Sequence, residues 1–181
     1  MAAVAATARL FRSDTASWSR LTVTSTLPGA AVVVLGSYLL LAFDRFGLQG
    51  FTEARATIRM LLTGVYGWLG LAVGAWLIAR FAWQKEPSLE PVVRLFGHAH
   101  IPLLVVAAAI QFISVTLQTT GVVLWVALPA VLLWMPAQML AAARVSLDLE
   151  RPQAVLAVLG PYVAWVVIVG RWLETQLGHL L

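Results

Sequence analysis

Residues 60–79 read MLLTGVYGWLGLAVGAWLIA, a run without a charge, and Arg59 and Arg80 stand immediately before and after it. A helix needs about 20 predominantly apolar residues to cross the hydrocarbon core of a bilayer. The apolar residues are continuous and do not alternate with polar ones, so the pattern does not favour a membrane-spanning strand. The segment therefore predicts a transmembrane helix.

Four other apolar runs have a comparable length and no charge in their central part. They cover residues 27–43, 101–117, 121–143 and 153–170. Together the five runs predict an all-α fold, a polytopic bundle of five transmembrane helices. Residues 1–26 are expected to form an interfacial helix or a flexible segment ahead of one transmembrane helical domain, residues 27–181. The first run begins too late for a typical signal peptide, so we expect it to remain as a membrane anchor.

The composition excludes several classes of function. Apolar residues make up 61% of the chain and charged residues 11%, against about 25% charged in an average soluble domain. The chain has no cysteine, which excludes disulfides and thiolate chemistry. No catalytic motif is found, and no acid or base lies within an apolar run, so neither an enzyme nor an ion-coupled carrier is expected.

Basic residues predict the orientation, because arginine and lysine are enriched in cytoplasmic loops. They stand singly at the ends of the apolar runs, which favours topology signals over a nucleic-acid surface. More of them fall on the side of the N-terminus, which we therefore place in the cytoplasm. We expect the chain to lie in the inner membrane of a bacterium. That side carries Arg9, Arg12, Arg20, Arg80, Lys85, Arg94, Arg144 and Arg151, and the other side Arg45, Arg55, Arg59 and Arg171.

Small residues on the second run predict close helix packing. Gly64, Gly67, Gly70 and Gly74 lie along it, and small residues four apart allow another helix to approach closely. Packing within the chain is the ordinary explanation, and a seam with a second copy or a partner subunit is the alternative. Pro129 and Pro136 in the fourth run are expected to bend that helix, either as a static bend or as a hinge.

Gln111 and Gln138 are the strongly polar residues well inside the runs, and each needs a hydrogen-bond partner in hydrocarbon. Residues 118–121 predict a tight turn that makes the third and fourth helices an antiparallel hairpin. His100 and Gln138 are equally far from Thr119 along the chain. We therefore expect Gln138 to lie near His100 and to share a hydrogen bond with it.

The segment Gly97-His98-Ala99-His100 is the one place that resembles a ligand motif, for haem or a pigment. Successive helical residues turn by about 100°, so His98 and His100 would point to nearly opposite sides of a regular helix. His179 is expected at the opposite membrane face. We therefore predict no cofactor and no metal, and interpret the histidines as boundary or packing residues.

Residues 95–104 read LFGHAHIPLL, and residues 152–162 read PQAVLAVLGPY. With these two segments, residues 94–174 resemble the Yip family, the Ypt/Rab-interacting membrane proteins, as it occurs in bacteria. The first segment is similar to the family's Gly-x-Ala-x-x-Pro start of the third helix, and the second is similar to its Lys-Ala start of the last helix and the Leu-x-Pro that follows. Residues 134–147 stand where the family has its tryptophan-containing fourth helix. The family's Gly-Tyr is Gly97-His98 here, and Gln153 replaces its basic residue.

The resemblance implies five helices and a cytoplasmic N-terminus. The sequence favours a non-catalytic integral membrane protein, a Yip-like scaffold or accessory subunit that packs against other membrane subunits. A small homo-oligomeric channel or permease is the alternative, and a haem- or pigment-binding subunit using His98 or His100 a third hypothesis. The expected partners are membrane lipids and other membrane-protein subunits or a second copy, without nucleic acid.

Overall fold

The computed structural model describes residues 15–46, 54–117 and 121–177. Within these residues the secondary structure is helical and contains no strand, which confirms the all-α prediction there. The helices are α2 (Thr15–Thr24), α3 (Leu27–Phe46), α4 (Ala54–Trp83), α5 (Leu89–His98), α6 (Ile101–Leu117), α7 (Gly121–Ser146) and α8 (Arg151–Leu177).

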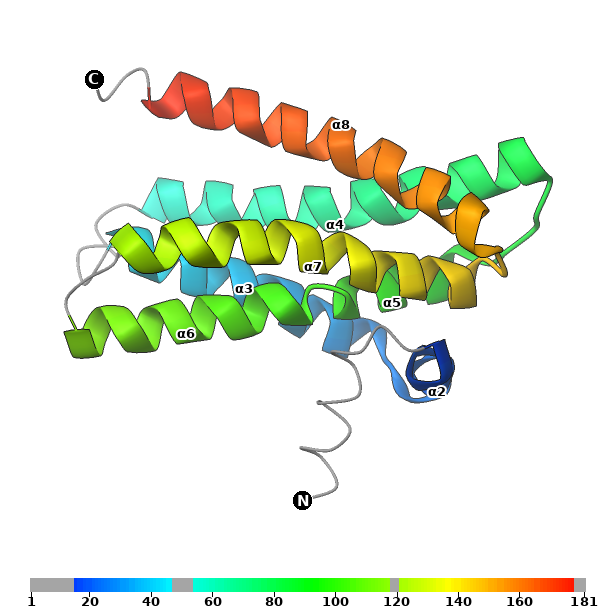
Figure 1. Cartoon of the computed structure of the whole chain (residues 1–181), viewed down its shortest axis with the longest axis horizontal. Coiled ribbons are helices and arrows are strands. Elements are labelled where there is room, and N and C mark those ends of the chain that lie inside the picture. Colours follow the sequence, from blue (N-terminus) through cyan, green and yellow to red (C-terminus); the bar gives the residue numbers. More distant parts are fainter. Residues whose placement is uncertain (1–14, 47–53, 118–120, 178–181) are drawn as a thin grey trace.

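The long helices run roughly side by side, with α2 lying across one end of them (Figure 1). Helix α3 packs against α4, α5 and α6, and α7 packs against α5, α6 and α8. Helix α8 packs against α4 and α7 at the edge of the bundle. The ends of α3, α6 and α8 lie at one end of the molecule, and the connections α4–α5 and α7–α8 lie at the other.

Three helical segments are long and apolar enough to cross a membrane: Thr57–Trp83, Leu89–Ile113 and Arg151–Ile168. The pair Thr15–Thr24 and Leu27–Ala42, bent by 114°, brings the number to four if it is counted as one span. These numbers refer to the described residues. They support an integral membrane protein.

Helix α5 precedes the third apolar run and was not predicted as a separate helix. It is amphipathic and buries Val92, Leu95, Phe96 and Gly97. The helix is interrupted by a turn at residues 99 and 100, and the chain continues as α6, whose second residue is the buried Pro102. Proline lacks an N–H and its ring clashes with the carbonyl four residues earlier. The break between α5 and α6 therefore follows from Pro102.

Helix α2 is held against the end of the bundle by an arginine from α5. The Arg94 guanidinium donates hydrogen bonds to the backbone oxygens of Ser25, at 3.0 Å, and Thr22, at 3.4 Å. Trp18 is buried beneath α2, where the helix packs against α5 and α7. Arg94 thereby satisfies carbonyls at and beyond the C-terminus of α2, which have no partner inside that helix.

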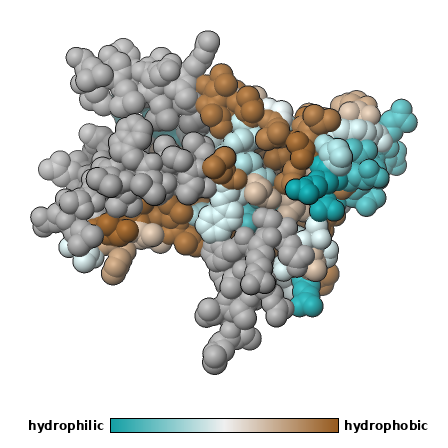
Figure 2. All heavy atoms as spheres, in the orientation of Figure 1, coloured by the Kyte–Doolittle hydropathy of each residue, from teal (hydrophilic) through white to brown (hydrophobic). Residues whose placement is uncertain are grey.

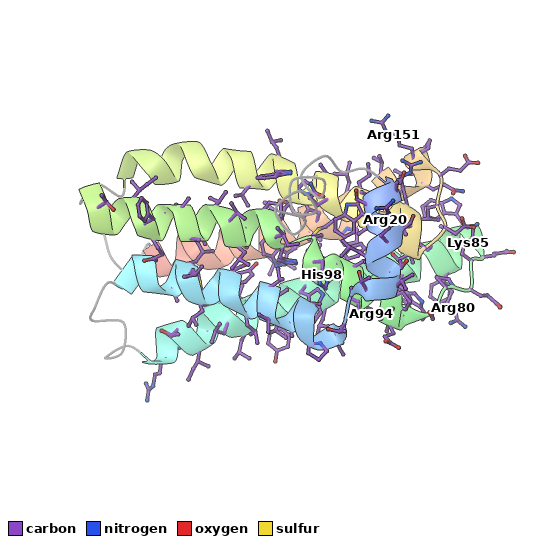
Figure 3. The ribbon with its side chains drawn as sticks, turned by 90° about the horizontal axis from the view of Figure 1, so that it is seen from below. Arg20, Arg80, Lys85, Arg94, His98 and Arg151 are labelled. Carbon is purple, nitrogen blue, oxygen red and sulfur yellow. The ribbon has the colours of Figure 1, made fainter. Side chains whose placement is uncertain are left out.

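The polar end of the bundle contains two tight loops. Gln84 follows α4 and Asp148 follows α7, and both have a positive φ, of 52° and 50°. Lys85 Nζ and Asp148 Oδ2 form an ion pair of 3.0 Å between the two loops. Figure 2 shows hydrophilic residues gathered at this end, and Figure 3 places Arg20, Arg80, Lys85, Arg94 and Arg151 there.

Candidate functional site

His98 and His100 face different parts of helix α3. His98 Nε2 lies 3.7 Å from the position that a Cβ on Gly29 would occupy, at the start of α3. The His100 ring is buried, and its centroid lies 6.4 Å from that of Tyr38. Gly29 and Tyr38 are nine residues apart, roughly 13 Å along a helix. This separation is too large for the two imidazoles to bind one metal ion.

Both imidazoles are oriented by the helix that carries them. His98 Nδ1 lies 2.9 Å from the Arg94 oxygen, and His100 Nδ1 lies 2.9 Å from the Phe96 oxygen. A carbonyl only accepts hydrogen bonds, so each Nδ1 is assigned a proton. The described residues contain no group of three or more histidine, cysteine, aspartate or glutamate side chains that could hold a metal. His179 lies outside the described residues.

Gln111 joins two helices. Its Nε2 donates a hydrogen bond of 2.6 Å to the backbone oxygen of Leu40, so α6 is tied to α3 by a partly buried contact. An amide in hydrocarbon is stabilised when a neighbouring helix supplies an acceptor. Gln111 therefore has its hydrogen-bond partner on a neighbouring helix.

Gln138 and His100 do not form the predicted hydrogen bond. Both side chains are buried, and Gln138 Nε2, Gln138 Oε1 and His100 Nε2 have no hydrogen-bond partner among the described residues. The turn near Thr119 lies outside the described residues. The equal-distance argument fixes only the depth of a residue and not the direction of its side chain, and the His100 ring is directed by the Phe96 carbonyl.

Three of the four glycines on α4 lie against other helices. A Cβ on Gly64 would overlap the Tyr38 ring of α3, and one on Gly67 would overlap the indole of Trp165 in α8. A Cβ on Gly74 would lie 2.9 Å from Pro161 Cγ. Real Cβ atoms are not found this close to other carbons, so these positions permit the approach of α3 and α8 to α4.

Gly70 differs, because no atom lies within 4 Å of the position of its Cβ. It opens into a groove of about 450 Å³ between α4 and α8. Pro161 fills the space at Gly74 and Trp165 fills it at Gly67, so the gap lies between these two contacts. The lining residues are mostly apolar: Thr63, Tyr66, Gly67, Gly70, Leu71, Pro161, Ala164, Trp165 and Ile168.

The groove can hold an apolar group, with few polar atoms to orient it. The Thr63 hydroxyl donates to the Arg59 carbonyl, at 2.8 Å, and is thereby occupied within its own helix. Tyr66 is 70% exposed and borders the groove. The arrangement offers shape and apolar surface, and none of its lining residues carries a charge.

The sequence analysis missed the groove and the Arg94 contact. Pro161 was noticed within the Leu-x-Pro segment, but its contact with Gly74 depends on the crossing of α4 and α8. Arg94 is flanked by the apolar residues Val92, Val93 and Leu95. That spacing indicates an amphipathic helix and could have revealed α5 and its arginine.

No family model, no curated protein and no solved structure matches this chain.

Proposed function

We propose that this chain is a non-catalytic, Yip-like membrane protein that acts as a scaffold or accessory subunit. Its five spans are α3, α4, α5 with α6, α7 and α8, and its N-terminus lies in the cytoplasm of a bacterial cell. It packs against a transmembrane helix of another membrane subunit, and the outer face of α8 is the docking surface.

The limited burial of α8 supports this proposal. In the 18-residue window Arg151–Ile168, 22% of the residues are buried inside the bundle, against 33% and 44% in the 18-residue windows of Thr57–Trp83 and Leu89–Ile113. Leu156, Val163 and Val167 are exposed on one face of α8, next to the exposed Gly160. A glycine flanked by larger apolar residues permits the close approach of another helix.

The distribution of the basic residues supports the orientation. Figure 3 places five cations at the end where α2 lies, whereas Arg55 and Arg59 stand at the start of α4, at the opposite end. Reporter fusions test the orientation: a cytoplasm-active reporter at Glu90 and a periplasm-active reporter at Leu181 are both expected to give signal. A silent Leu181 fusion would contradict either the number of spans or their direction.

Native mass spectrometry after gentle detergent extraction tests the scaffold role. We expect a stable hetero-complex that is lost in Gly160→Leu and retained in Ala109→Leu, the control on α6. Ala109 is also small and exposed, so both variants add the same kind of bulk to a membrane-facing surface. A homo-oligomer would instead favour the channel or permease, and a monomer unaffected by either change would contradict docking on α8.

A further inference from the structure

We propose that the groove between α4 and α8 binds one acyl chain of an anionic phospholipid, whose phosphate lies beside Arg55 and Arg59. The groove adjoins the proposed docking face of α8, since Gly160 lies beside Ile78 of α4, but the inference does not depend on the scaffold role. It requires only that α4 and α8 lie in a bilayer.

The shape of the groove fits a flexible apolar chain. Gly70 leaves a space that Pro161 and Trp165 close on either side of it, so the space is narrow along the contact between α4 and α8. It is open to the outside of the bundle, where lipid surrounds the helices. Apolar surface without a protein neighbour loses its dispersion contacts unless another apolar group fills it.

The charge at one end of the groove selects the headgroup. Arg55, Arg59, Thr63, Tyr66 and Gly70 follow at intervals of three and four residues, so they share one face of α4. Arg55 and Arg59 are exposed, and the first turn of α4 has no acidic residue. Helical side chains lean toward the N-terminus, which directs both guanidinium groups away from the groove and toward the membrane surface. The helix dipole adds positive potential at the same end.

The length of this face corresponds to one leaflet. Arg59 and Gly70 are eleven residues apart, a rise of roughly 16 Å, which is close to half of a hydrocarbon core about 30 Å thick. A phosphate at Arg59 therefore places its acyl chain at Gly70 near the middle of the bilayer. Tyr66 and Trp165 border this path.

Native mass spectrometry of the full chain with added lipid tests the proposal. The probes are phosphatidylglycerol and phosphatidylcholine with identical acyl chains. The wild-type chain is expected to retain one phosphatidylglycerol in preference to phosphatidylcholine. Arg59→Gln is expected to lower this preference about fivefold, the effect of one cation near a membrane surface. Arg80→Gln, at the other end of α4 and also exposed, is the charge-matched control and is expected to keep the preference.

Gly70→Leu is expected to abolish retention of both lipids, because the leucine fills the groove. A melting temperature equal to the wild-type value shows that the bundle is intact, and Arg59→Gln gives an independent result because its side chain is exposed. Unchanged lipid retention in Gly70→Leu, or an unchanged preference in Arg59→Gln, overturns the proposal. The proposal is also overturned if the Gly70→Leu substitution releases a bound protein instead of a lipid.

Discussion

Substituting Gly97 by alanine tests the packing of α5 at the centre of the bundle. An added Cβ would lie 2.6 Å from the Ala30 Cβ of α3 and 3.1 Å from two ring carbons of Trp68 in α4. Carbon atoms pack best at about 3.5–4.0 Å, so α3 and α5 would have to separate by about 1 Å. The neighbours cannot yield easily. The Ala30 methyl group is buried and is bonded directly to the backbone, so it cannot rotate away. The Trp68 indole donates a 2.7 Å hydrogen bond to the Val93 oxygen, which holds its ring in place.

The expected cost follows from two opposing effects. Overpacking a dense core costs about 1–3 kcal/mol, and replacing glycine by alanine within a helix contributes about 1 kcal/mol in the other direction. Because the neighbours are held in place, we expect Gly97→Ala to lower the free energy of unfolding by about 1–2 kcal/mol.

Unfolding in detergent with increasing dodecyl sulfate, followed by circular dichroism, measures this free energy. Gly70→Ala is the matched control, since no atom lies within 4 Å of its Cβ position. The control gains the same helix propensity without the overlap, so it is expected to be at least as stable as the wild type. If Gly97→Ala were as stable as Gly70→Ala, the close approach of α3, α4 and α5 at Gly97 would be refuted.

Three further substitutions probe individual contacts. Gln111→Met removes the hydrogen bond to the Leu40 oxygen and is expected to cost about 0.6–1.7 kcal/mol of unfolding free energy; an unchanged value in the same titration would contradict that role. Arg94→Gln removes two hydrogen bonds to the backbone at the end of α2, so the local stability of α2 measured by amide hydrogen exchange should fall by about 2 kcal/mol. Wild-type protection of the α2 amides would argue against the contact. Gln84→Gly relieves a positive φ of 52° and is expected to stabilise by about 1 kcal/mol, which a lowered melting temperature would disprove.

The sequence was sufficient to locate the long helices because hydrophobic length is a local property. The first apolar run begins at Leu27, as does α3. The second was predicted at 60–79, but α4 extends at both ends, to Ala54–Trp83. Arginine at the end of an apolar run does not terminate a helix, since its long side chain can reach the headgroups while the backbone stays helical. The same reason explains why α8 extends beyond both ends of the run 153–170.

The site could not be predicted in the same way, because it depends on how helices cross. Gly67, Gly70 and Gly74 are equivalent in the sequence pattern, yet two of them contact α8 and Gly70 faces the groove. The difference arises from the positions of Pro161 and Trp165 on a helix about 90 residues later in the chain. The hydrogen bond expected between His100 and Gln138 was wrong for a related reason, since equal depth does not fix the direction of a side chain and the His100 ring is turned to the Phe96 oxygen.

The contact between Arg94 and α2 also bears on how the chain is assembled during synthesis. Arg94 binds oxygens that precede it by 69 and 72 residues. At about 5–20 residues per second, ribosomes need roughly 4–14 s to produce the intervening chain. During that interval α2 has neither Arg94 nor the α5 and α7 surfaces that cover Trp18. Helix α2 is therefore synthesised early but reaches its final position only after later helices have been inserted. A ribosome-bound chain that ends before Arg94 should leave α2 accessible to protease.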